Sequence, residues 1–188
     1  GIGCQWSGGA HGKCQQLSEL LMVDADESSF ASDHEAHCLH LDASGSARGA
    51  AAMPNLAAHR LNEGIANISE LLKKSELVIL LTALGGGTGS GAASEIAARS
   101  REAGSLVISI VGIPFAEQPL RCAIAEKALP PIERNSDLCI RVSLERLAWQ
   151  ARHRNSDWKI GSEWIGELIE GLVTTLAKVG KMNLDLMD

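Results

Sequence analysis

A glycine-rich segment, GGGTGSG at residues 85–91, lies between an apolar run and an alanine-rich run. The apolar run, Leu77 to Ala83, is predicted to be a buried strand, and the residues from Gly89 to Ala103 have the pattern of a helix. Consecutive glycines let the backbone curl with its N–H groups turned inward, and the following helix adds the positive end of its dipole. The segment is therefore predicted to bind an anion, most simply a phosphate group.

Other kinds of glycine loop are the alternatives for this segment. A dinucleotide-binding loop needs GxGxxG at the first strand–helix turn and an acidic residue about 20 positions further on, and no such acid follows here. A Walker A loop needs a lysine after the glycines, which is also missing. The stretch from Ser7 to Cys14 departs from the Walker pattern at its first and last positions. A flexible glycine turn or a dinucleotide site thus remains as the alternative.

Short apolar runs alternate with helical patterns along the rest of the chain. Most of these runs are rich in Val, Ile and Leu without polar alternation, which is typical of strands buried on both faces. The alternation predicts an α/β fold, a doubly wound and mostly parallel sheet with helices on both faces. Pro130-Pro131 is expected to end the helix that runs from Arg121. The predicted strands are 20–25, 38–42, 76–83, 105–113 and 138–143, and the clearest helices are 57–74, 89–103 and 158–178.

The composition narrows the classes of function. The 188 residues, 45% of them hydrophobic, suffice for one substantial core and one domain. The net charge of −6 and the scattered basic residues argue against direct nucleic-acid binding and favour a protein partner or a small ligand. The five cysteines contain no CxxC pair, which indicates a reducing compartment such as the cytoplasm. No apolar run approaches the roughly 20 residues of a transmembrane segment.

In its place between a strand and a helix, GGGTGSG resembles the signature loop of the tubulin/FtsZ superfamily, in the form of its prokaryotic FtsZ-like branch. Further segments follow in the family's order, so the resemblance covers most of the chain. It implies a cytoplasmic, cytoskeletal GTPase that polymerises head to tail with copies of itself. It also implies GTP or GDP as ligand, with Mg²⁺ bound mainly through the phosphates. No set of protein metal ligands is predicted.

The resemblance gives the domain boundaries. Residues 1–188 would form the nucleotide-binding GTPase domain, with the central helix at about 158–179 and a synergy loop at 180–188. The resemblance implies that the family's C-terminal activation domain lies outside this sequence. Gly1-Ile2-Gly3 is expected to form a turn that follows a strand, so the sequence is expected to be part of a longer protein.

The phosphate-binding residues are likewise implied by the resemblance. Ala51 stands where the family has a glycine, and Met53 where it has an asparagine. The implied residues are Gly1, Gly3, Cys4 and Gln5 in a first loop, Asp24 and Asp26 in a second, Ala50 and Ala51 in a third that senses the terminal phosphate, and Gly85, Gly86, Gly87, Thr88, Gly89 and Ser90 in the signature loop.

Three charged residues are implied to bind the rest of the nucleotide. Glu117 would accept hydrogen bonds from the ribose and Arg121 would approach the nucleotide, if one residue is deleted before Glu117; the alternative is an ordinary i,i+4 ion pair. Glu163 takes the place of the acid that recognises guanine, where a carboxylate accepts from N1–H and the exocyclic amine. The alternative for Glu163 is a solvated helix residue.

This sequence differs from the family's pattern at two places that are implied to contact the nucleotide base. The Asn-Asp pair that the family has after its fifth strand is Leu144-Glu145 here. The stacking aromatic aligns with Lys159, beside Trp158, so Trp158 either substitutes for it or is a core or interface residue.

The chain ends in NLDLMD, which looks like the family's synergy loop. A helix of about 20 residues spans about 30 Å, so acids at its far end cannot reach the nucleotide of their own subunit. The resemblance implies that Asp185 and Asp188, supported by Asn183, act on the attacking water in the neighbouring subunit. The alternative is a polar helix stop.

Three functions stay open at this stage. The first is a polymerising GTPase whose hydrolytic site is completed at the subunit interface. The second, suggested by the altered third loop and the missing Asn-Asp pair, is a divergent relative that binds nucleotide and assembles or regulates without efficient hydrolysis. The third is a dinucleotide-dependent oxidoreductase on a similar sheet.

Overall fold

A computed structural model describes residues 2–14, 19–30, 36–41, 52–156 and 160–177 of the chain. Strands and helices alternate along most of it. The elements in order are α1 (Ile2–Lys13), β1 (Leu21–Asp24), the 3-10 helix η1 (Glu27–Phe30), β2 (His37–His40), α2 (Pro54–Gly64), α3 (Ala66–Lys74), β3 (Leu77–Ala83), α4 (Gly87–Glu102), β4 (Leu106–Ile113), α5 (Pro119–Arg134), β5 (Leu138–Ser143), α6 (Leu144–His153) and α7 (Ile160–Ala177).

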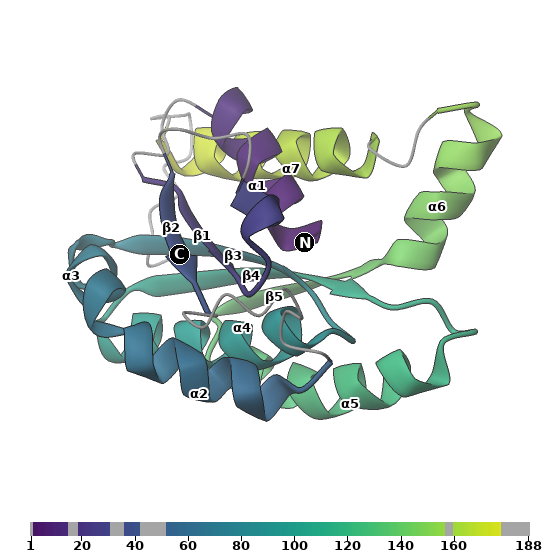
Figure 1. Cartoon of the computed structure of the whole chain (residues 1–188). Helices are drawn as coiled ribbons and strands as arrows, with labels where there is room; N and C mark the ends of the chain where they lie inside the picture. The colour runs from purple at the N-terminus through teal and green to yellow at the C-terminus, as the bar shows by residue number, and fades with distance from the viewer. Residues whose placement is uncertain (1, 15–18, 31–35, 42–51, 157–159, 178–188) are drawn as a thin grey trace.

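The elements form three layers. Helices α1 and α7 lie over one face of the strands, and α2, α4 and α5 lie over the other (Figure 1). All strand pairs in the described residues are parallel, in the order β3-β4-β5 for one sheet and β1-β2 for the other. The predicted α/β fold with helices on both faces is confirmed.

The core explains the continuous apolar runs of the strands. On β4, Val107 and Val111 pack with α2, α4 and α5, whereas Ile110 points to the opposite face and packs with α1 and α7. All three side chains are 0% exposed. A strand that is covered by helices on both faces has no solvent-exposed face, so its sequence does not alternate between apolar and polar residues. Each of the five predicted strands has a counterpart, which lies within the expected range for four of them, whereas β2 begins one residue earlier than expected.

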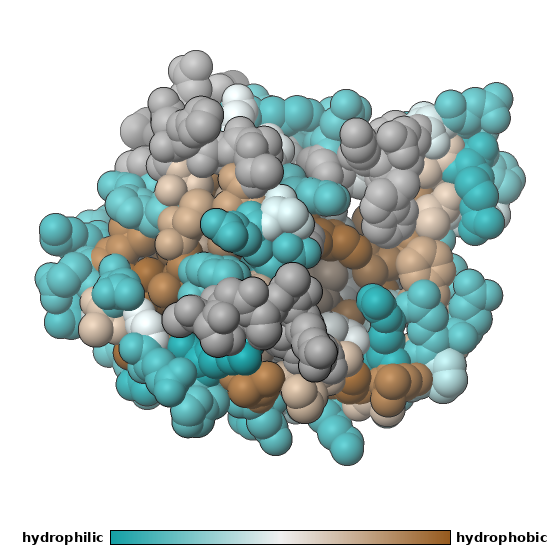
Figure 2. All heavy atoms as spheres, in the orientation of Figure 1, coloured by the Kyte–Doolittle hydropathy of each residue, from teal (hydrophilic) through white to brown (hydrophobic). Residues whose placement is uncertain are grey.

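Hydrophilic side chains cover much of the molecular face in Figure 2, and apolar ones gather mainly in the band between the two helix layers. Among the described helices, none combines the length and the apolar character needed to cross a membrane.

The prediction that Pro130-Pro131 ends its helix is wrong. Helix α5 continues to Arg134, because Ile132 is fully buried in the core and holds the last turn in place. The carbonyls that lose their amide partners belong to Glu126 and Lys127, which are exposed and can be hydrated. The side-chain amide of Asn135 also donates to the Pro131 carbonyl at 2.9 Å, which satisfies one group at the helix end.

Three other expectations need correction. One helix was expected over 57–74, and the structure has two, α2 and α3. The break follows Gly64, which lies beside Leu39, because glycine has a low helix propensity. Helices α1 and α6 were not anticipated. The strands also form two sheets rather than one, because β1 and β3 are not hydrogen-bonded to each other.

Candidate functional site

The predicted phosphate-binding turn joins β3 to α4 and is held by its own side chains. Gly85 has φ of +94°, a conformation that favours glycine. Its N–H donates to the Ser90 hydroxyl oxygen at 3.0 Å, and the Thr82 hydroxyl donates to the Gly89 carbonyl at 2.9 Å. The curl of the backbone is therefore fixed by hydrogen bonds at both ends.

The glycines of the turn serve different purposes. A Cβ at Gly89 would lie 2.2 Å from the Ala83 carbonyl oxygen, and one at Gly91 would lie 2.0 Å from that of Pro54. These two glycines let α4 approach β3 and α2 closely. A Cβ at Gly86 would meet no atom of the described residues within 4 Å, so among these residues this glycine borders open space instead.

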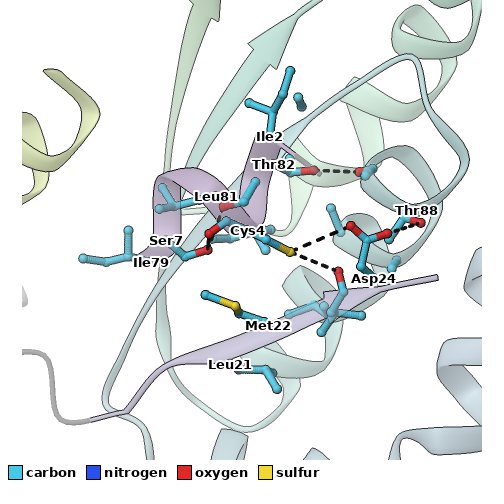
Figure 3. A pocket seen from close by; sticks show the side chains of 18 of the residues that line it. Ile2, Cys4, Ser7, Leu21, Met22, Asp24, Ile79, Leu81, Thr82 and Thr88 are labelled. Carbon is cyan, nitrogen blue, oxygen red and sulfur yellow. Dashed lines mark hydrogen bonds between the residues drawn. The ribbon is translucent and has the colours of Figure 1, made fainter. Parts of the chain in front are cut away.

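That open space is a cavity of about 590 Å³. Figure 3 shows its walls, with Cys4 and Ser7 from α1, Met22 from β1 and Leu81 from β3 turned toward one another. The predicted site residues that line it are Gly3, Cys4, Asp24, Gly86, Gly87, Thr88, Gly89 and Arg121.

The start of α4 is open toward this cavity. No side chain of the described residues caps the helix, which begins at Gly87 after Gly86 in an extended conformation. The first N–H groups of a helix lack partners within the helix and carry its positive dipole end. Uncapped amides beside a cavity that Gly86 leaves free fit a phosphate group, so this part of the sequence prediction has a suitable geometry.

Asp24 is the acidic group of the cavity. Its carboxylate accepts hydrogen bonds from the Ala25 N–H at 2.7 Å and the Thr88 hydroxyl at 3.3 Å, which ties β1 to the start of α4 (Figure 3). Burial raises the pKa of this carboxyl, whereas the hydrogen bonds that it accepts lower it, and the net direction is downward. Asp24 is therefore ionised at neutral pH.

Cys4 lies beside Asp24. Its sulfur is 3.9 Å from the Asp24 carboxylate and 3.9 Å from the Val23 carbonyl oxygen. Burial, and also the charge of Asp24, raises the pKa of the Cys4 thiol, which therefore stays protonated at neutral pH.

The expected turn over the first three residues is wrong for Ile2 and Gly3, which lie in α1. Gly3 packs against β3, since a Cβ there would be 2.7 Å from the Leu81 carbonyl oxygen. Gln5, in the same helix, is exposed. The helical pattern was hidden because this segment is rich in glycine and has almost no apolar stripe.

Several implied residues are not brought into this cavity. Asp26 binds Ser28 at 2.8 Å, and the buried Ser90 hydroxyl is engaged within the turn. Glu117 lines a second cavity of about 410 Å³ with Glu145 and Arg152.

Glu163 is exposed in the first turn of α7, and the Lys13 ammonium donates to its backbone carbonyl at 3.3 Å. The ion pairs between described side chains do not include one between Glu117 and Arg121. Residues Gly1, Ala50, Ala51, Trp158, Lys159, Asn183, Asp185 and Asp188 lie outside the described residues.

The sequence prediction missed three residues of the site. Thr82 fixes the turn, and its signal is a single hydroxyl residue in an otherwise apolar run. Pro114 and Gln118 also line the large cavity. Both follow β4, and only the register between β3 and β4 places them next to the glycine turn.

Comparison with known proteins identifies the family. A family model described as "Tubulin/FtsZ family, GTPase domain" matches residues 9–150. The cell division protein FtsZ of Haloferax mediterranei is 33% identical over 144 residues, which are 75% of this chain and 38% of that protein. FtsZ of Mycoplasmopsis pulmonis is 30% identical over 175 residues, 90% of this chain and 44% of that protein.

Solved structures share the fold. An FtsZ dimer of M. jannaschii has a TM-score of 0.77 at 23% identity, covering 90% of this chain and 50% of that one. A GTPγS-bound protofilament of CetZ2 from Haloferax volcanii has a TM-score of 0.79 at 18% identity, covering 98% of this chain and 58% of that one. The chain thus spans about two fifths of the length of these curated relatives. With a family model that matches most of its length, the chain belongs to the Tubulin/FtsZ family.

Proposed function

We propose that this chain is the nucleotide-binding part of an FtsZ-like cytoskeletal GTPase of the cytoplasm. It binds GTP or GDP, assembles head to tail with copies of itself, and hydrolyses GTP at the contact between subunits. One observation carries the proposal: the start of α4, uncapped in the part of the chain that the structure describes, borders the cavity next to Gly86, where none of the described side chains fills the space. Membership in the Tubulin/FtsZ family makes a guanine nucleotide the expected ligand.

The charges of the cavity support a cation as co-ligand. The ionised Asp24 beside the turn would repel a phosphate group, and Asp24 could help to hold a divalent cation, whose charge would offset that repulsion. Carboxylate and phosphate oxygens are the ligands that Mg²⁺ takes in nucleotide sites, usually together with water. Arg121 adds a positive charge to the wall of the same cavity.

Base recognition is proposed for Glu163, and ribose binding for Glu117. The two are exposed on α7 and on the segment that follows β4, so both are accessible to a ligand that extends beyond the phosphate cavity. The exposed residues Asp26 and Gln5 stay proposed contacts, as do Gly1, Ala50 and Ala51. Asp185 and Asp188, with Asn183, are proposed to orient the attacking water in a neighbouring subunit.

Phosphoryl transfer depends mostly on positioning and on neutralised charge, so a shared site of this kind is chemically sufficient. The backbone amides at the start of α4 hold the phosphates and stabilise their charge. A carboxylate supplied by the next subunit would orient water at the terminal phosphate. Hydrolysis then requires assembly.

A specific observation favours the second candidate, a relative that binds nucleotide without efficient hydrolysis. Leu144 stands where the family has an asparagine, and its side chain is 4% exposed in the core beneath α7. It cannot hydrogen-bond a base. A nucleotide held through its phosphates but positioned less firmly at the base would still bind and would be hydrolysed more slowly.

Nucleotide binding and turnover together test the proposal. GTP at about 100 times its dissociation constant should raise stability by about 2.7 kcal/mol, visible as a higher melting temperature, whereas NADH should have no effect. GTP turnover per subunit should rise steeply with protein concentration. Asp188→Ala should lower turnover by about 10²–10⁴-fold and leave the melting shift unchanged. No melting shift with GTP contradicts nucleotide binding. A shift with no turnover at any concentration selects the second candidate.

A further inference from the structure

The second cavity, of about 410 Å³, adjoins the large one. Phe115 lines both cavities, and the neighbouring residues Leu144 and Glu145 line the large and the second cavity respectively. The volume of the second cavity lies in the range of roughly 300–1,000 Å³ that small-molecule sites have. A ligand whose phosphates lie at the start of α4 therefore has a path past Phe115 into the second cavity.

One face of α6 forms a wall of the second cavity. Glu145, Ala148 and Arg152 line it, and their spacings of three and four residues place them on the same side of the helix. The rest of the lining, Phe115 and Glu117, comes from the segment that follows β4. The walls thus carry two carboxylates and one guanidinium.

The guanidinium of Arg152 keeps most of its donors available. Its Nε–H donates to the Ala148 carbonyl at 3.4 Å, one turn earlier in α6. Within the part of the chain that the structure describes, its two terminal nitrogens make neither an ion pair nor a hydrogen bond, although Glu117 and Glu145 line the same cavity. The N–H groups of a guanidinium form a planar fork that matches two adjacent acceptors. Arg152 can therefore bind a ligand group that has two acceptors side by side.

Guanine has such a pair of acceptors. Its O6 and N7 atoms lie next to each other and both accept hydrogen bonds, whereas adenine has an amino donor beside its N7 acceptor. A bidentate contact from arginine to O6 and N7 is the commonest specific contact that proteins make to guanine in DNA. The same fork placed on adenine would meet a donor and lose one of its two bonds. An arginine at this edge therefore favours guanine over adenine.

The end of α6 also lies near Glu163, the proposed base contact on α7. The Arg154 guanidinium is 5.1 Å from the centre of the Trp164 ring, a cation–π contact that joins the end of α6 to the start of α7. Arg152 precedes Arg154 by two residues, and Glu163 is next to Trp164. A carboxylate accepts from N1–H and the exocyclic amine, so Glu163 and Arg152 would contact different edges of one base.

We propose that Arg152 is a specificity-determining residue for the guanine base, with its terminal nitrogens donating to O6 and N7. The inference rests on the proposed function, because it takes a guanine nucleotide as the ligand. It also bears on Leu144, which stands where the family has an asparagine and whose side chain is buried in the core. A base contact that Leu144 cannot make is then supplied from the second cavity.

Titration of the full chain with GDP analogues tests this role, and diphosphates avoid turnover during the measurement. One analogue is a deaza form of GDP with a CH group in place of N7, and another is inosine diphosphate, which lacks the exocyclic amine proposed to bind Glu163. Arg152→Gln removes the fork, and Arg152→Lys keeps the charge without it. Arg146→Gln is the matched control, because Arg146 is exposed on α6 and is not among the described residues that line the second cavity.

The unaltered chain should bind GDP about tenfold more tightly than the deaza analogue, and it should discriminate against ADP by at least as much. Arg152→Gln should weaken GDP binding about tenfold and make GDP and the deaza analogue equal, while the loss from GDP to inosine diphosphate stays unchanged. Arg152→Lys should recover only part of the difference, and Arg146→Gln should match the unaltered chain. The melting temperature without nucleotide should be the same in all these chains, because both arginines are exposed.

The contradicting outcomes separate this role from the proposed function. If the unaltered chain does not bind GDP, the proposed function is overturned and the role of Arg152 with it. If the unaltered chain binds GDP and the deaza analogue equally well, the role of Arg152 alone is overturned. An equal loss of affinity for both ligands in Arg152→Gln has the same meaning, because it shows that the arginine does not contact N7.

Discussion

At the scale of single residues, neighbouring glycines of one turn have separate tasks. Gly89 is required because its surroundings leave no room for a Cβ, whereas Gly86 is surrounded by space on the cavity side. The GGGTGSG pattern alone treats these positions alike. The physical difference is the distance to the Ala83 carbonyl oxygen, which is set by how closely α4 packs on β3.

These two positions make a matched pair of variants. Gly86→Ala should leave the melting temperature nearly unchanged and weaken GTP binding about tenfold, because a methyl group enters the phosphate space. Gly89→Ala should lower the free energy of unfolding by about 1–3 kcal/mol, because its Cβ overlaps the backbone of β3. Thermal unfolding and nucleotide titration of both variants check this. Equal loss of stability in the two would contradict the division of tasks.

Asp24 gives a prediction about the cation. Asp24→Asn keeps an oxygen that can accept from the Ala25 N–H and removes the charge beside the phosphate turn. Nucleotide affinity in the absence of Mg²⁺ should rise by about threefold to tenfold, and the gain from adding Mg²⁺ should shrink. Glu102→Gln, an exposed site in the last turn of α4, has the same change in charge and should alter neither quantity. If the two variants have the same magnesium dependence, Asp24 does not interact with the cation.

At the scale of elements, α5 shows how packing overrides local preference. The two prolines remove hydrogen bonds, yet the helix continues because buried Ile132 lies beyond them. The low helix propensity of proline is a property of the local sequence, whereas the burial of Ile132 depends on packing against β4 and α4. Helix α1 is a similar case, since its glycine-rich sequence has little helical pattern and buried Trp6 and Ala10 attach it to the core.

Pro130→Ala tests how much stability the proline costs inside α5. The substitution restores an amide donor for the Glu126 carbonyl inside an existing helix, so the free energy of unfolding should rise by about 1 kcal/mol, with part of the gain offset by the greater freedom of the unfolded chain. Denaturant unfolding checks the shift in midpoint. Pro119→Ala, at the start of the same helix where proline is favourable, should be neutral or destabilising. A lower midpoint for Pro130→Ala would show that the prolines are required by packing.

At the scale of the whole molecule, the cavity connects fold and function. Its polar end is formed by the glycine turn and Asp24, and its apolar end by residues of β1 and β3. Asp24 lies at the end of β1 and bonds Thr88 of α4, so the separation of the sheets influences the shape of the phosphate site.

The sequence by itself determined the strands, the parallel α/β fold and the phosphate-binding turn, because two-sided apolar runs and the glycine segment are local patterns with a direct physical meaning. It also brought out Asp24, Thr88 and Arg121 as site residues, through resemblance to the family. Only the tertiary structure decided that Ser90 serves the turn, that Glu117 and Glu163 lie outside the large cavity, and that β1 and β3 leave a gap. These features depend on distances between segments far apart in the chain, which no local pattern specifies.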